Sequence, residues 1–140
     1  MHMAKIGIIG AGSWGIALSV LLHNNGHEIT VWSILEDEIN MLKTEHEHKD
    51  KLPGVKLPED MIFTTSLPEA IEGKDILVLA VPSPFTRSTS HNMKPYVADG
   101  QIIVNVAKGI EEHTLMTLSQ IIEEEVPQAN VAVLSGPSHA

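Results

Sequence analysis

The chain has 140 residues, of which 43% are hydrophobic and only 4% aromatic, and its formal net charge is −9. This length fits one domain with a mostly aliphatic core. The acidic balance and the single arginine, Arg87, exclude the clustered basic surface that nucleic acid binding requires. The absence of cysteine excludes disulfides, and no apolar run reaches the roughly 18 residues that span a bilayer. We therefore expect a cytoplasmic protein without a nucleic acid or membrane partner.

The first half of the chain predicts strands that alternate with helices. Apolar runs predict the strands, and apolar residues at helical spacing predict the helices. The expected elements are strands over 4–10, 27–32 and 62–65, and helices over 13–25, 36–48 and 67–73. Asn24-Asn25-Gly26 is a helix stop signal, and Ser66 is expected to cap the third helix. The prolines and glycine of 51–58 predict a loop.

The second half continues the same alternation. Its expected strands cover 75–81, 101–107 and 130–135. Pro82 and Pro84 end the first of these strands and begin a helix through about Tyr96. A second helix is expected to start at a Thr114 cap and run to about Glu125.

Four of the expected strands, over 4–10, 75–81, 101–107 and 130–135, are continuous apolar runs rather than alternating patterns, which favours a parallel sheet covered on both faces. Six strands with intervening helices predict an α/β, doubly wound Rossmann sheet, and right-handed crossovers predict the strand order 3-2-1-4-5-6. Ligands of such sheets bind at the carboxyl ends of the strands, where the order reverses between strands 1 and 4.

A glycine fingerprint lies at that point of the chain. Gly10, Gly12 and Gly15 are spaced as G-x-G-x-x-G between the first expected strand and helix. This context is typical of dinucleotide binding, in which the amides of Ser13 and Trp14 would meet a pyrophosphate at the helix N-terminus. The alternative is a glycine-rich turn that binds nothing.

Other strand ends carry unusual residues. Lys108 follows an apolar strand and could place a cation in the crevice, although an ordinary exposed lysine is the alternative. Phe85 could pack on a cofactor or simply within its loop. Ser135-Gly136-Pro137-Ser138 offers hydroxyls and a bend next to the following strand end, or is only a turn.

With these clusters, the chain resembles the N-terminal domain of the bacterial type of NAD(P)-dependent glycerol-3-phosphate dehydrogenase. The resemblance covers residues 4 to 140 and includes GAGSWG, LPGVKLP, AVPS, KGIE and SGPS-x-A in the same order. It implies interconversion of sn-glycerol 3-phosphate and dihydroxyacetone phosphate by hydride transfer, which feeds glycerophospholipid synthesis. The implied cofactor contacts, beside the glycines, are Ser13, Trp14, Phe85, Lys108 and Ala140, and the implied substrate contacts are Lys108, Gly136 and Ser138.

The resemblance also implies what this chain lacks. The family carries its proton-transferring lysine and most of its substrate pocket on a second, all-helical domain, so we assign no catalytic residue here. Residues 1–3 are interpreted as a cloning remnant with the native start, and 4–140 as the NAD(P)-binding domain. His139 replaces the family's usual aromatic residue at a position that is not catalytic, and we expect it to pack or to face solvent. Assembly into a homodimer is a further possibility.

The choice between NAD and NADP is not decided by the sequence. An NAD site favours an acidic side chain after the second strand, whereas Ser33 stands there and Glu36 and Asp37 follow slightly late. An NADP site favours a cation, and the nearest candidate is Lys43 because Arg87 is far along the chain. We lean towards NAD or dual use.

The charged runs 36–38 and 123–125 are interpreted as solvated helix faces, and 45–50 as a solvated helix end rather than a metal site. Two other functions stay open. One is another Rossmann reductase, such as a 3-hydroxyacid dehydrogenase or ketopantoate reductase. The other is a freestanding nucleotide-binding module.

Overall fold

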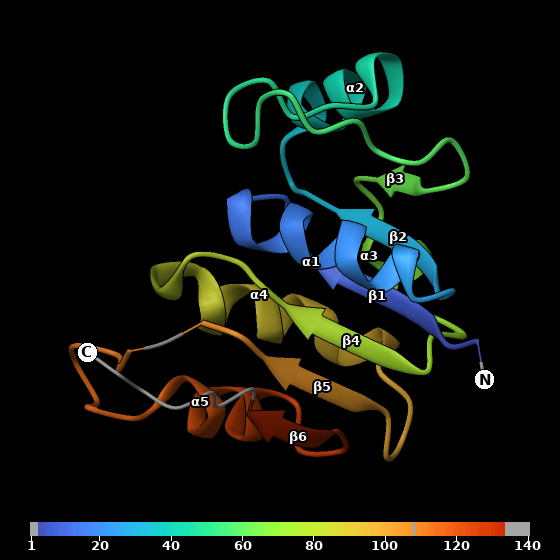
Figure 1. Ribbon diagram of the computed structural model, residues 1–140. Helices are drawn as coiled ribbons and strands as arrows, with labels where there is room; N and C mark the ends of the chain where they lie inside the picture. Colours follow the sequence, from blue (N-terminus) through green and yellow to red (C-terminus); the bar gives the residue numbers. More distant parts are fainter. Residues whose placement is uncertain (1–2, 108, 134–140) are drawn as a thin grey trace.

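A computed structural model describes residues 3–107 and 109–133 (Figure 1). A parallel sheet with the strand order β3-β2-β1-β4-β5-β6 runs through the molecule, which confirms the predicted fold and order. The strands are β1 (Lys5–Ile9), β2 (Glu28–Trp32), β3 (Ile62–Thr64), β4 (Ile76–Leu79), β5 (Ile102–Asn105) and β6 (Asn130–Val133). The helices are α1 (Ser13–Asn24), α2 (Glu36–Glu45), α3 (Leu67–Ile71), α4 (Thr86–Met93) and α5 (Leu118–Glu125), with short 3₁₀ turns η1 (Ser83–Phe85) and η2 (Lys94–Tyr96).

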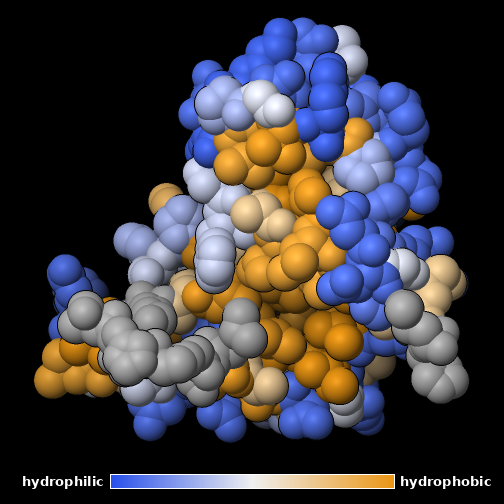
Figure 2. Space-filling view, in the orientation of Figure 1, coloured by the Kyte–Doolittle hydropathy of each residue, from blue (hydrophilic) through white to orange (hydrophobic). Residues whose placement is uncertain are grey.

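Helices lie on both faces of the sheet, so successive side chains of a central strand enter different cores. In β1, Ile8 packs with residues of α1 and α2, whereas Ile9 packs with residues of α3, α4 and α5. Both side chains are fully buried, as the continuous apolar runs predict. Figure 2 shows apolar side chains gathered on the face that carries α1, with polar side chains covering α2 and the segment beside it.

Two of the predicted helices differ clearly in extent from those of the structure. The helix expected over 36–48 ends at Glu45, because His46 adopts a left-handed conformation (φ 50°) as its C-cap. The helix expected from Pro82 to Tyr96 is divided into η1, α4 and η2, with a proline in the first turn of each 3₁₀ segment. Proline lacks the N–H that a continuous helix needs in its interior, which accounts for the division.

The predicted Thr114 cap is wrong. Helix α5 is capped by Thr117, whose hydroxyl accepts a hydrogen bond from the Gln120 amide while the Gln120 side chain accepts one from the Thr117 amide. Such a reciprocal capping box satisfies two donors at once. The predicted Ser66 cap of α3 is confirmed by its hydrogen bond from the Glu69 amide. Among the described residues, every helix is too short or too polar to cross a membrane.

Candidate functional site

The turn from β1 to α1 has the geometry that the glycine fingerprint requires. Gly10 has φ +124°, a conformation that favours glycine, and a Cβ there would come within 2.8 Å of the Ala80 backbone. A Cβ on Gly15 would lie 2.3 Å from the Gly10 carbonyl oxygen, so the helix approaches the turn closely. Beside Gly12, in contrast, a Cβ would meet no other part of the described chain within 4 Å. Gly10 and Gly15 therefore shape the turn, whereas Gly12 leaves room for a ligand.

Gly12 is also the N-cap of α1 and has no side chain with which to satisfy the first amides of the helix. The first hydrogen bond of the helix runs from the Ile16 amide to the Gly12 carbonyl. The amides of Ser13 and Trp14 come before it and have no partner within the helix. An anion placed above Gly12 would meet these donors and the positive end of the helix dipole.

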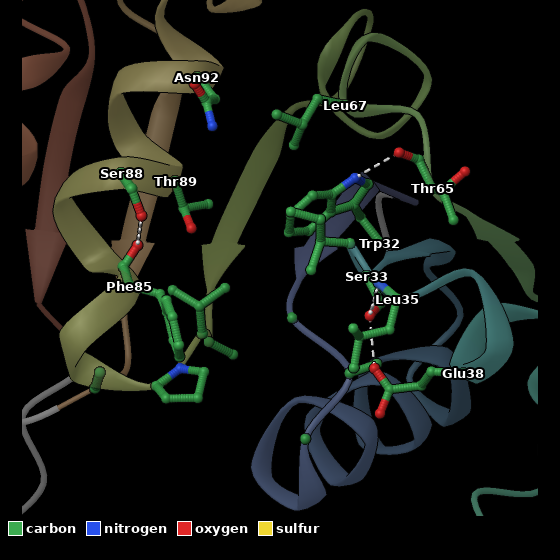
Figure 3. A pocket seen from close by; sticks show the side chains of 18 of the residues that line it. Trp32, Ser33, Leu35, Glu38, Thr65, Leu67, Phe85, Ser88, Thr89 and Asn92 are labelled. Atoms are coloured by element: carbon green, nitrogen blue, oxygen red, sulfur yellow. Dashed lines mark hydrogen bonds between the residues drawn. The ribbon is translucent and has the colours of Figure 1, made fainter.

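A cavity of about 1260 Å³ opens at this turn, along the carboxyl ends of the central strands (Figure 3). One wall comes from the end of β2 and includes Trp32, Ser33 and Leu35. The opposite wall comes from η1 and α4 and includes Phe85 and Thr89. The cavity therefore lies at the switch point of the doubly wound sheet, where such folds bind their ligands.

The β2 wall contains a hydrogen-bonded cluster around Glu38, whose side chain is only 9% exposed. The Ser33 hydroxyl donates to Glu38 Oε1 at 2.6 Å, and His48 Nε2 lies 2.6 Å from Oε2. The ammonium of Lys51 lies 3.3 Å from the same Oε2. This cluster joins the end of β2 to α2 and to the loop that follows it.

The environment of Glu38 keeps its carboxyl ionised. Burial works against the charge, but hydrogen bonds from Ser33 and His48 and the charge of Lys51 outweigh it and lower the pKa of Glu38. The prediction that 36–38 forms a solvated face is thus wrong at Glu38. The prediction of a solvated end over 45–50 is wrong at His48, which is 2% exposed.

Arg87 stands in α4, which contributes to the opposite wall, but it does not line the cavity and instead binds carboxylates from two other segments. Its guanidinium makes two hydrogen bonds to Glu111, of 2.8 and 2.9 Å, and contacts Glu125 at 2.6 Å and Glu124 at 3.1 Å. These bonds, with one from Thr114, lower the pKa of Glu111 to about 2. The interpretation of 123–125 as a solvated face is wrong at Glu125, which is partly buried by this contact.

The structure brings several predicted site residues together. Gly10, Gly12, Ser13, Trp14 and Phe85 all line the cavity, whereas Gly15 does not line it and packs against Gly10 of the turn. The Trp14 and Phe85 side chains are each 57% exposed, so neither ring is packed into the core. The predictions for Lys108, Gly136, Ser138, His139 and Ala140 concern positions outside the described residues.

Sequence reasoning missed Glu38, His48 and Lys51 as parts of one site. One pattern did point to Glu38. It stands next to Ile39 and four positions before Leu42, so helical spacing places it near the inward face of α2. No comparable pattern in the sequence indicated that the loop after α2 brings His48 and Lys51 back to Glu38.

The strand order, the glycine turn and the cavity at the switch point define a Rossmann dinucleotide-binding domain. Residues 5–140 match the model of the family described as NAD-dependent glycerol-3-phosphate dehydrogenase N-terminus. The chain belongs to this family.

Relatives and solved structures agree with that assignment. The chain is 65% identical to a glycerol-3-phosphate dehydrogenase of Agathobacter rectalis and 57% identical to one of Fusobacterium nucleatum, both named for NAD(P)+. It covers 41% and 42% of their lengths, and they cover 99% of this chain. The crystal structure of the Coxiella burnetii glycerol-3-phosphate dehydrogenase superposes with a TM-score of 0.89 at 30% identity, over 98% of this chain and 42% of that one.

Proposed function

We propose that this chain supplies the cofactor-binding part of an enzyme that interconverts sn-glycerol 3-phosphate and dihydroxyacetone phosphate with NAD or NADP. The observation that carries the proposal is the open space at Gly12, above uncapped helix amides and inside the cavity at the switch point. Membership of the family supports the choice of substrates. The proposal includes a cytoplasmic role in supplying glycerol phosphate for lipid synthesis.

The residues of the cavity fit an extended dinucleotide. The pyrophosphate would accept hydrogen bonds from the Ser13 and Trp14 amides at the start of α1. Half of the cofactor would then extend along the β2 wall and the other half towards Phe85. When bound, the nicotinamide supplies the hydride acceptor for oxidation of the alcohol. Lys108, Gly136, Ser138 and Ala140 are proposed contacts through the family resemblance.

Binding through the glycine turn predicts a specific mutational effect. In Gly12→Val the new side chain would occupy the space proposed for the pyrophosphate, so NADH binding should fall below detection in calorimetric titration. Gly12→Ala adds a smaller group and should weaken binding less. Since a Cβ at Gly12 would meet no other described part of the chain within 4 Å, both variants should keep the wild-type circular dichroism spectrum. A folded Gly12→Val chain with wild-type affinity would refute the proposal.

A second prediction concerns turnover. The 140-residue chain covers about two-fifths of its relatives, and we propose that the base and much of the substrate pocket belong to the remaining part. Loss of a general base alone costs about 10²- to 10⁴-fold in rate, and loss of positioning adds to it. NADH formation from glycerol 3-phosphate should therefore be undetectable for this chain and measurable for a full-length relative. Comparable turnover would show that the chain contains the base itself.

A further inference from the structure

The β2 wall of the cavity carries an unusual distribution of charge. Among the described residues that line the cavity, Glu38 is the only carboxylate and Lys51 the only lysine or arginine. They stand together, 3.3 Å apart, where the end of β2 meets the loop after α2. The backbone of Lys51 is also tied to the glycine turn, because its carbonyl accepts a 2.8 Å hydrogen bond from the Ser13 hydroxyl. A ligand that follows the turn towards β2 therefore reaches this pair.

Glu38 is held in one position but keeps hydrogen-bonding capacity. An ionised carboxylate has about four acceptor positions. Ser33, His48 and Lys51 supply three donors, which fix the carboxylate against the end of β2. One acceptor position is left for a hydroxyl of a ligand. In a doubly wound sheet, an acidic side chain after the second strand binds the 2′-hydroxyl of the adenosine ribose. Glu38 lies in the first turn of α2, and its bond from Ser33 brings its carboxylate to the end of β2.

More carboxylates surround the same place. A shallow hollow next to the cavity shares Leu35, Glu38 and Lys51 with it and is also lined by Glu36, Asp37 and Asp50. Lys51 is thus the one lysine or arginine beside four carboxylates in the described lining of this hollow. A 2′-phosphate would add further negative charge there, and like charges at short range repel.

We propose that this cluster selects a dinucleotide with a free ribose 2′-hydroxyl over one with a 2′-phosphate. Glu38 accepts a hydrogen bond from the hydroxyl, and the carboxylates of the hollow oppose a phosphate. Lys51 provides the charge that keeps the phosphorylated cofactor able to bind. The inference rests on the proposed function, since it concerns one end of the same dinucleotide site.

The test compares dissociation constants for NADH and NADPH at one ionic strength, measured by titration of the full chain. The wild type should bind NADH at least about fivefold more tightly, a difference of about 1 kcal/mol. Lys51→Met should weaken NADPH binding by about tenfold and change NADH binding by less than about threefold. Lys56→Met, on the same loop but outside the lining of the cavity, is the matched control and should change neither constant.

A second variant works in the opposite direction. Glu36 and Asp37 are exposed, so the double substitution Glu36→Gln and Asp37→Asn should leave the fold intact. It should tighten NADPH binding by about threefold and leave NADH binding unchanged, because only the phosphate is repelled. Glu38→Gln should weaken NADH binding. If this variant fails to fold, the Lys51→Met and the Glu36→Gln, Asp37→Asn variants still test the proposed selectivity.

The outcomes separate the inference from the proposed function. Equal affinities for the two cofactors in the wild type, or a preference for NADPH, would overturn the inference while the dinucleotide site stands. The same conclusion follows if Lys51→Met and Lys56→Met give the same ratio of constants. Failure of the wild type to bind either cofactor would overturn the proposed function itself.

Discussion

One charge cluster of the molecule lines the cavity next to β2, the other is centred on α4 without lining the cavity, and the two are built in opposite ways. In the first turn of α2, next to the end of β2, one carboxylate, Glu38, is held by a hydroxyl, an imidazole and an ammonium. At α4 one guanidinium, Arg87, is held by three carboxylates. The exposed fraction of the central side chain is 9% for Glu38 and 29% for Arg87.

The difference in burial indicates what each cluster contributes. Removing one member of a buried charged cluster leaves the other members without hydrogen-bond partners. Because these groups also have no access to water, the folded state is strongly destabilised. A partly exposed cluster can exchange its bonds for water and is screened by salt. We therefore expect the Glu38 cluster to matter more for stability, whereas the Arg87 cluster mainly ties α5 and the Glu111 segment to α4.

The largest effect is expected when the buried carboxylate is removed. Glu38→Leu leaves the Ser33 hydroxyl and His48 Nε2 without their acceptor, and should lower the free energy of unfolding by about 2–4 kcal/mol. Glu36→Leu, on the exposed side of the same helix, is the control and should cost less than about 1 kcal/mol. Urea denaturation at pH 7 measures both. Equal losses would show that burial does not distinguish the two positions.

The sequence was sufficient for the fold because the relevant patterns are local or topological. Continuous apolar runs identified β1, β4, β5 and β6, shorter segments rich in β-branched residues identified β2 and β3, and the right-handed crossover rule ordered the strands. The sequence was a poorer guide to a helix boundary where two neighbouring residues both fitted the same capping pattern. Thr114 and Thr117 both fit a cap, and only Thr117 is followed at the third position by a glutamine that completes a capping box.

The site was predictable to the extent that it lies on one continuous segment. The spacing of Gly10, Gly12 and Gly15 identified the turn, whose shape depends on its own backbone and on β4. The Glu38 cluster depends on His48 and Lys51, which return to the end of β2 through a loop. The Arg87 cluster joins residues that are 24 to 38 positions apart. Neither arrangement leaves a periodic pattern in the sequence.

A smaller loss of stability is expected when the Arg87 cluster is broken. Arg87→Met removes the cation that holds Glu111 and Glu125, so the midpoint of thermal unfolding should fall, but by less than in Glu38→Leu. Arg87→Lys should lie between wild type and Arg87→Met, because lysine keeps the charge without the bidentate geometry. Lys94→Met removes an exposed cation near the end of α4 and serves as the control. A larger fall in the unfolding midpoint for Arg87→Met than for Glu38→Leu would show that the Arg87 cluster contributes more to stability than the Glu38 cluster.

The smallest expected effect is the pH dependence of the Arg87 contribution. Arg87 lowers the pKa of Glu111 from an ordinary 4.5 to about 2, and it lowers the pKa of Glu125 as well. A carboxyl whose pKa is lower in the folded state stabilises the fold above its unfolded pKa, and that stabilisation is lost as the pH falls through the folded value. The difference in unfolding midpoint between wild type and Arg87→Met should therefore be constant above about pH 5 and shrink as the pH falls towards 2. Thermal unfolding of both proteins at matched ionic strength over this range measures it. A difference that stays constant or grows on acidification would mean that Arg87 stabilises the fold through its packing rather than through Glu111 and Glu125.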